Sequence, residues 1–328
     1  MQAAARFLSR WSPTLSDRVL LIGQQAYESG DYVKAFHEFV PLAQRGNADA
    51  QRNLGNMYHE GLGVPQDYNE AIKWYRLAAD QGHPSAQSNL ANMYHEGEGL
   101  PRDDKEAVRW YCLAANQGHA PAQFNLGLMY EHGTEALAQN DTEAMRWFGL
   151  AAEQGYADAQ FNLGVMYGKG QGVPPDYVQA HMWFDLVSAN GDADGNKNRD
   201  IIAGMMTPDQ IAEAQRLAQE WKPKTGAESM LAVYNTQVAE FFQTLNEGPE
   251  NIMPIEFSRL LDRVDDLIDV GVMLGEPAED LVKTLRSLHQ VMTSELEKAV
   301  PETRENQATI NSLREVLRAL RKSPTRPN

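Results

Sequence analysis

The sequence of 328 residues has only one cysteine, no long apolar run and no excess of basic residues. The single cysteine, Cys112, excludes an internal disulfide and fits a reducing compartment. No stretch approaches the roughly 18 apolar residues that a membrane-spanning helix needs. The chain holds 29 Lys and Arg against 45 Asp and Glu, a net charge of −16. This balance disfavours nucleic acid and anionic membrane surfaces as partners, since both attract basic proteins.

The N-terminal segment, residues 1–13, lacks the pattern of a secretory signal. The only apolar run near it is Val19–Ile22, whereas a signal has roughly 7–15 apolar residues before a cleavage site. The first 16 residues contain Arg6 and Arg10 but no acidic residue, which faintly resembles a transit peptide. We expect an amphipathic first helix and a cytoplasmic protein, with the periplasm or an organelle as open alternatives.

The composition is that of a soluble globular protein, with 42% apolar and 23% charged residues. The length predicts about two domains, each able to bury a core of its own.

An internal repeat dominates the first two thirds of the chain. The block Ala-Gln-x-Asn-Leu-x-x-Met-Tyr starts at Ala50, Ala86, Ala122 and Ala159, in steps of 36, 36 and 37 residues. A second block, Ala-x-x-Trp followed by Tyr or Phe, starts at Ala71, Ala107, Ala144 and Ala180 with the same spacing. The one extra residue falls in the loop at 133–140, and an insertion there leaves helix packing intact.

Each repeat unit predicts two helices. In the first helix, Ala50, Leu54 and Tyr58 lie on one face at a spacing of four residues. The second helix opens with Asp67-x-x-Glu70 and its equivalents, which predict capping boxes. It ends at a glycine suited to the left-handed position that follows a helix: Gly82, Gly118, Gly155 and Gly191. Small residues such as Gly55 predict close approach of neighbouring helices, and stacked units would share one continuous core.

These blocks resemble the Sel1-like repeat, a relative of the tetratricopeptide repeat. Four units match, at 48–83, 84–119, 120–156 and 157–192, after a divergent first unit at 17–47. Residues 193–222 are similar to the closing helices of bacterial Sel1-like arrays. The resemblance implies an all-α fold, a right-handed α-solenoid over residues 1–222, that serves as an interaction scaffold.

The C-terminal third, residues 223–328, does not continue the repeat. Helical patterns at about 227–246, 254–274, 277–299 and 302–321 are separated by short breaks that contain proline. These lengths predict an antiparallel helical bundle or an oligomerisation module, through which the chain could form a homo-oligomer.

The most informative candidate site is a column of asparagines, one on each first helix. In related tetratricopeptide arrays the first helices line the concave groove, and an amide can both donate to and accept from a peptide backbone. Phe124 and Phe161, at a neighbouring position, would make the later half of this groove more apolar. The alternative is that asparagine is simply the usual residue of this repeat. The column consists of Asn53, Asn89, Asn125 and Asn162.

Other sites are disfavoured, and we expect no catalytic residue, cofactor or metal. Histidines at equivalent positions, such as His59 and His95, lie about one repeat width apart, roughly 15–20 Å. One zinc ion could not bind both, since its bonds to nitrogen are about 2.0–2.1 Å long. His289 is the only histidine of the C-terminal third, but Met292 follows it where histidine phosphotransfer domains usually have lysine.

The sequence therefore favours a non-enzymatic scaffold that binds a protein or peptide in the concave groove. Its C-terminal helices would mediate oligomerisation or a second interaction. Two alternatives stay open: a signalling component whose C-terminal bundle accepts a phosphoryl group or senses a ligand, and, less favoured, an enzyme.

Overall fold

The computed structural model describes residues 15–226 together with isolated positions of the C-terminal third. These positions are 228, 231, 234, 238, 264, 278, 279, 281–283, 285–287, 289 and 290. The chain divides into two compact units, Met1–Gly226 and Ala227–Asn328. The predicted C-terminal bundle lies outside the described residues, so the account below concerns the first unit.

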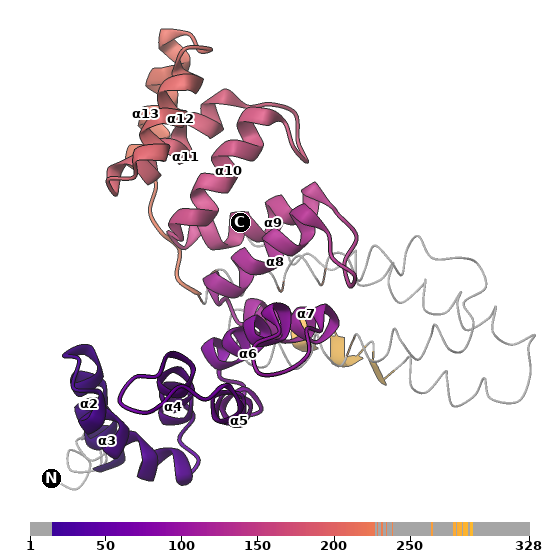
Figure 1. Ribbon diagram of the computed structural model, residues 1–328. Helices are drawn as coiled ribbons and strands as arrows, with labels where there is room; N and C mark the ends of the chain where they lie inside the picture. Colours follow the sequence, from indigo (N-terminus) through magenta and orange to yellow (C-terminus); the bar gives the residue numbers. More distant parts are fainter. Residues whose placement is uncertain are drawn as a thin grey trace, which may run out of the picture. The chain divides into compact units, whose positions relative to one another are not determined.

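The described part of the first unit is built only of helices, arranged as consecutive pairs that follow one another along an arc in chain order (Figure 1). From α2 to α12, each helix packs against the next one along the chain, both within a pair and between pairs, whereas α13 packs against α11. The first helices of the pairs are α2 (Leu15–Glu28), α4 (Ala48–Glu60), α6 (Pro84–Glu96), α8 (Ala120–His132), α10 (Ala157–Lys169) and α12 (Ala193–Ala203). The second helices are α3 (Tyr32–Gln44), α5 (Tyr68–Ala79), α7 (Asp104–Asn116), α9 (Asp141–Glu153), α11 (Tyr177–Ala189) and α13 (Pro208–Glu220). None of the described helices is long and apolar enough to span a membrane.

Of the two hydrogen bonds that a capping box predicts, the one accepted by the side chain of the first residue is confirmed, and the reciprocal one is not. The side chain of Asp67 accepts hydrogen bonds from the backbone N–H groups of Asn69 and Glu70, and Asp103, Asn140 and Asp176 cap their helices likewise. The reciprocal half of the capping box was wrong in all four repeats, because the backbone N–H of each cap residue donates to a carbonyl of the first helix, as Asp67 does to Tyr58. In the first three repeats the acidic side chain instead pairs with a cation three residues on. These pairs are Glu70–Lys73, Glu106–Arg109 and Glu143–Arg146.

The predicted close approach of first and second helices is confirmed at a glycine of the first helix. A methyl group added at Gly164 would lie 2.7 Å from the ring of Phe184, and one at Gly127 would lie 2.5 Å from Phe148. The aromatic ring of the second helix therefore rests directly on the backbone of the first.

The extra residue of the third repeat is confined to its loop. The hydroxyl of Thr134 accepts hydrogen bonds from the N–H groups of Ala136 and Leu137, which folds the insertion into a local turn. The loop then rejoins the common path, since Asn140 donates to the carbonyl of Tyr130 just as Asp103 donates to that of Tyr94. Helices α8 and α9 keep the same length of 13 residues.

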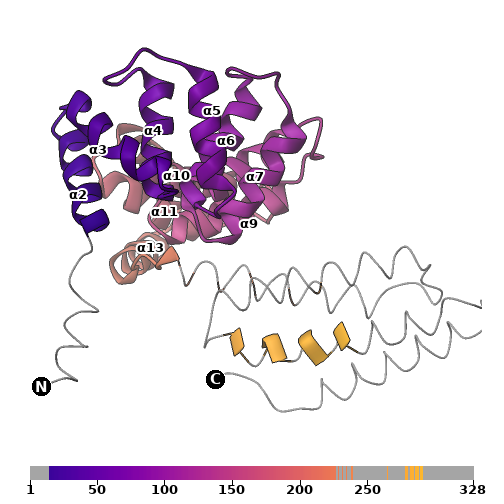
Figure 2. The ribbon, with the colours of Figure 1, turned by 90° about the horizontal axis from the view of Figure 1, so that it is seen from below.

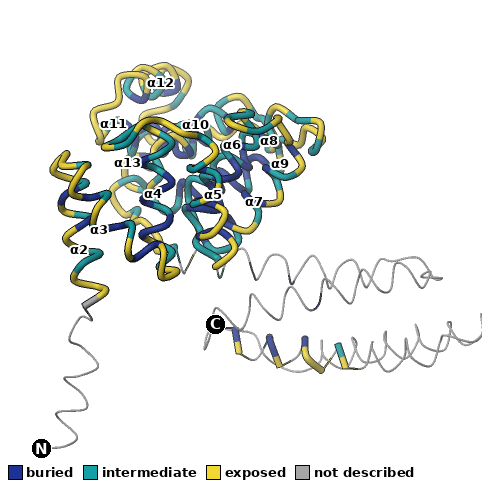
Figure 3. Tube along the Cα trace, turned by 60° about the horizontal axis from the view of Figure 1, so that its bottom comes forward, coloured by how far each residue is buried: buried dark blue, intermediate teal, exposed yellow. Residues whose placement is uncertain are grey.

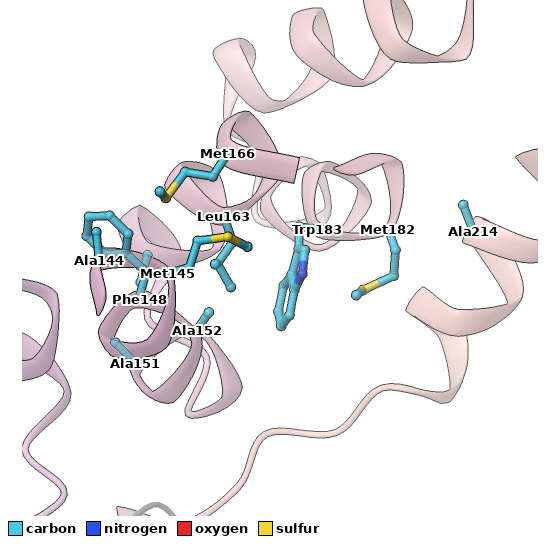
Figure 4. Packing of buried hydrophobic residues seen from close by; sticks show 11 residues of the cluster. Ala144, Met145, Phe148, Ala151, Ala152, Leu163, Met166, Met182, Trp183 and Ala214 are labelled. Carbon is cyan, nitrogen blue, oxygen red and sulfur yellow. The ribbon is translucent and has the colours of Figure 1, made fainter. Parts of the chain in front are cut away.

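The core lies between successive helices, while the loops remain exposed (Figures 2 and 3). One cluster joins the last two repeats to the closing helix α13: Met182 and Trp183 of α11 pack with Ala214 of α13 (Figure 4). The ring of Trp221 extends this contact, edge to face with Trp183 at 6.4 Å between centroids. The closing helix thus covers the last repeat.

The segment after α13 doubles back over the ends of earlier helices. The backbone N–H of Lys224 donates to the carbonyl of Glu153 at 2.7 Å, and its ammonium group pairs with the Glu153 carboxylate at 2.8 Å. Trp221 and Pro223 lie beside Gly155, and Gly226 lies against Gly118. Residues 221–226 are therefore docked on the second and third repeats.

Candidate partner-binding surface

The four asparagines of the column differ in exposure. Asn53 is buried, at 5% exposure, which leaves its amide out of reach of a partner at the surface. Asn89, Asn125 and Asn162 are partly buried. All four lie on first helices, one residue before a buried leucine.

Two of the asparagines tie successive repeats together. Asn89 donates from Nδ2 to Oδ1 of Asn56 in the preceding repeat at 2.9 Å, and the hydroxyl of Tyr75 donates to the same oxygen at 2.8 Å. Burial raises the pKa of Tyr75, which keeps its hydroxyl protonated as a donor. The same triad recurs one repeat later with Asn125, Asn92 and Tyr111. Part of the column therefore has a structural role.

The triad ends before the fourth repeat because its partners become apolar. Leu128 stands where Asn92 stands one repeat earlier, and Phe148 stands where Tyr111 does. Among residues 15–226, no hydrogen bond to the side chain of Asn162 is found. Asn162 is therefore the member of the column whose amide is most available to a partner.

The two phenylalanines take part in the packing of the array, and they remain partly exposed. Phe124 contacts Phe148 and Tyr156, with centroids 5.6 and 5.2 Å away, and Phe161 contacts Phe184 at 5.7 Å. Leu128 and Val165, one turn further along the same helices, are also partly buried. Phe161 and Asn162 are adjacent on α10, which brings an apolar ring next to an available amide.

A second polar column was missed by the sequence analysis: the glutamine that follows the first alanine of each repeat. Gln87 donates to the carbonyl of Ala79 in the preceding repeat and accepts from Gln117 of its own repeat at 2.7 Å. Gln123 repeats this arrangement with Ala115 and Gln154. All four glutamines, Gln51, Gln87, Gln123 and Gln160, are at most 4% exposed. The sequence did contain a signal for this column, since the glutamine is present in all four blocks. Because these glutamines are buried, they stabilise the array and cannot bind a partner.

Most histidines of residues 15–226 lie at or next to helix ends, whereas His37 and His181 lie within α3 and α11. His59 pairs with Glu98 of the next repeat at 2.7 Å, and His95 with Asp104 at 2.8 Å. His119, at the start of α8, lies 3.2 Å from the hydroxyl of Ser85, and burial lowers its pKa to about 4. In the described part of the chain, no group of three His, Cys, Asp or Glu is arranged to hold a metal ion.

Comparison with known proteins identifies the repeat. The family model of the Sel1 repeat matches four times, at residues 48–83, 84–119, 120–156 and 157–192. The curated proteins gave no match. Among known structures, a Sel1 repeat protein from Oxalobacter formigenes is 28% identical with a TM-score of 0.51, over 66% of this chain and 90% of that one.

A second structure is more distant in sequence. The protein c5321, described as a protective antigen present in uropathogenic Escherichia coli strains and displaying an SLR fold, is 21% identical with a TM-score of 0.54. The match covers 95% of this chain and 88% of that one, and at this identity it shows a shared fold alone. Both proteins are bacterial, and both share the helix-pair architecture. Residues 48–192 therefore match four consecutive Sel1 repeats, and the chain is similar to bacterial Sel1 repeat proteins of known structure.

Proposed function

We propose that this protein is a non-enzymatic scaffold whose first helices bind a protein or peptide partner in the concave groove of a right-handed solenoid. Repeat arrays of this kind build extended binding surfaces from equivalent positions of successive units. The C-terminal third, residues 223–328, would add an antiparallel bundle for oligomerisation or for a second interaction.

One observation carries this proposal: the partly exposed face of the first helices changes character along the array. In the first two repeats it presents Arg52, Asn56 and Asn92, whereas in the last two it presents Phe124 and Phe161. A partner that fits this face would place polar groups against the early repeats and an apolar side chain against the late ones. Buried aromatic anchors commonly dominate such binding energies.

The asparagines retain the chemistry to hold a backbone. Asn89 and Asn125 use Nδ2 in the contacts between repeats, and their carbonyl oxygens accept no hydrogen bond from residues 15–226. These oxygens can accept from a partner's N–H groups. Asn162 can offer both its donor and its acceptor.

The test is affinity capture with crosslinking from the native host, using the full chain and the double variant Asn162→Ala with Phe161→Ala. We expect the variant to stay folded and to lose the captured partner, with wild-type crosslinks mapping to α8 and α10. Asn53→Ala is the matched control, since its amide is buried and capture should persist. Equal capture by the folded double variant would remove the groove assignment.

A further inference from the structure

The outer face of the second helices carries exposed leucines at one repeat position. Leu77 of α5 is 43% exposed, and Leu113 of α7 is 41% exposed. The equivalent residues of the last two repeats, Leu150 and Leu186, are only partly exposed. Large apolar side chains that stay exposed at the same position of successive repeats indicate a surface for binding a partner, because exposed side chains contribute little to the stability of the fold.

In the last repeat an amphipathic helix packs beside this position. Helix α13 contacts α11, and Leu186 of α11 packs against the same cluster as Leu217 and Ala218 of α13. The side chains of α13 in or against this cluster are Ala214, Leu217 and Ala218, with Trp221 directly after the helix. A helix laid along a repeat face is a recurring mode of recognition.

The charges around the uncovered leucines differ from those in the last repeat. Lys73 and Arg109 stand where the last repeat has Met182, and Arg76 stands where it has Asp185. Glu70 and Glu106 partly neutralise Lys73 and Arg109. The guanidinium of Arg76 contacts the hydroxyl and ring of Tyr94 and pairs with no carboxylate of the described residues.

A groove adjoins Leu77, between α5 and the loop that precedes α7. Its volume is about 760 Å³, and Leu77, Leu100 and Pro101 supply its apolar lining. Lys73, Arg76 and Arg102 line it as cations, against the carboxylates of Asp80 and Asp103. Asp103 is already engaged as the cap of α7, and Arg102 pairs with Asp104. The groove thus combines apolar side chains with three cations and two carboxylates, in a protein whose net charge is −16.

From this arrangement we infer a second docking surface, on the outer faces of α5 and α7, for an acidic amphipathic helix of a partner protein. The leucines would contact the apolar stripe of that helix, as the apolar side chains of α11 pack with α13. Lys73, Arg76 and Arg109 would face its carboxylates. This surface is separate from the first-helix groove and does not depend on that proposal.

The probe for this surface is a fluorescent peptide of residues 206–221, the acidic helix that the structure already shows on α11. Titrated with the full-length protein, its anisotropy should rise to saturation. The variant Leu77→Glu with Leu113→Glu should weaken binding about tenfold or more, as should Arg76→Glu. Both leucines are exposed, so these variants should unfold at the wild-type temperature.

Two controls distinguish binding to this surface from nonspecific hydrophobic binding. The variant Ile201→Glu with Met205→Glu replaces apolar side chains of similar exposure, 49% and 58%, on α12 and just after it, and should bind normally. A peptide with Asp209, Glu213 and Glu220 changed to Lys should bind weakly. Absence of saturable binding, or equal binding by the leucine variant, would overturn the inference. Peptide-sensitive self-association in light scattering would also overturn it, since a second copy would then be the occupant.

Discussion

Gln154 donates a hydrogen bond from Nε2 to Oε1 of Gln123 at 2.7 Å, and Gln123 donates in turn to the carbonyl of Ala115 at 3.1 Å. A single glutamine therefore joins three helices: α8, where it lies, α9 of the same repeat and α7 of the preceding one. The carbonyl of Ala115 is in the last turn of α7, where it also accepts from the backbone N–H of Gly118. Gln51 and Gln87 make the same connections earlier in the array.

Replacing Gln123 with leucine should destabilise the array by about 1–3 kcal/mol, because it removes two hydrogen bonds between helices at about 0.5–1.5 kcal/mol each. Urea unfolding followed by circular dichroism measures the loss. Gln160→Leu is the matched control. Asn190 stands where Gln154 stands one repeat earlier, and no residue of 15–226 donates to the Gln160 side chain, so its cost should be smaller. Equal losses would contradict the proposed linkage through Gln154.

Adding a methyl group at Gly164 should also destabilise the array, by about 1–3 kcal/mol, because the added carbon would lie 2.7 Å from Phe184. The second repeat already contains Ala91 at this position, opposite Tyr111. Ala91→Gly therefore serves as the reverse experiment and should cost at most about 1 kcal/mol, the helix propensity of glycine. If Gly164→Ala unfolded at the same temperature as the wild type, α10 and α11 would have moved apart to accommodate the methyl group without a loss of stability.

His119 should make the protein less stable as the pH falls from about 6.5 towards 4. Burial lowers its pKa in the folded protein to about 4, below the ordinary value of 6.5, so the unfolded chain binds the proton first. The stability that depends on neutral His119 is complete above pH 6.5 and falls by up to about 3 kcal/mol by pH 4. The ring makes no capping hydrogen bond at the start of α8, whereas Asn47 caps α4.

His119→Asn should therefore remove part of this pH dependence and keep or raise the stability at pH 5. Urea midpoints at pH 7 and pH 5, for wild type and variant, give the difference directly. Other acid-sensitive groups, such as Asp104, whose pKa its contacts with Arg102 and His95 lower, are common to both proteins and cancel. Parallel pH profiles would show that His119 titrates normally.

The docked segment 221–226 should depend more on Trp221 than on its ion pair. Trp221→Ala removes the ring that packs on Trp183 and beside Gly155, and should expose the Lys224–Thr225 bond to trypsin. Glu153→Gln removes only an exposed ion pair, which contributes little, and leaves the hydrogen bond between Lys224 and the backbone intact. We expect cleavage at Lys224 to accelerate clearly in the first variant and hardly in the second, as followed by mass spectrometry. Faster cleavage of Glu153→Gln than of Trp221→Ala would show that the ion pair, and not the packing of Trp221, holds residues 221–226 in place.

Much of the fold could be predicted from the sequence because the residues that begin and end each helix recur in four successive repeats. The spacing of 36 residues, the N-caps such as Asp67 and the final glycines such as Gly82 each follow from backbone chemistry within one turn of a helix. Gly82 adopts the left-handed conformation, with φ of +85°, that its position predicted. Such local preferences need no knowledge of the neighbouring repeat.

The candidate site was less predictable, because it depends on contacts between repeats. The sequence places Asn53, Asn89, Asn125 and Asn162 at one position, yet their surroundings differ. Phe39 precedes Asn53 where Tyr75 precedes Asn89, so only the latter has a hydroxyl nearby to share a hydrogen-bonding triad. Burial of one amide and availability of another follow from residues more than 10 positions away.

The sequence by itself determined the helix pairs, their boundaries and the Sel1 repeat, since these rest on periodicity and capping within each unit. Only the tertiary structure decided which polar side chains serve the array and which remain available to a partner. It also showed that residues 221–226 return to Glu153 and Gly118, and that α13 packs on α11 while Leu77 and Leu113 stay exposed. The physical reason is that burial and hydrogen bonding of a side chain are set by the helices packed around it, and chain spacing alone does not specify them.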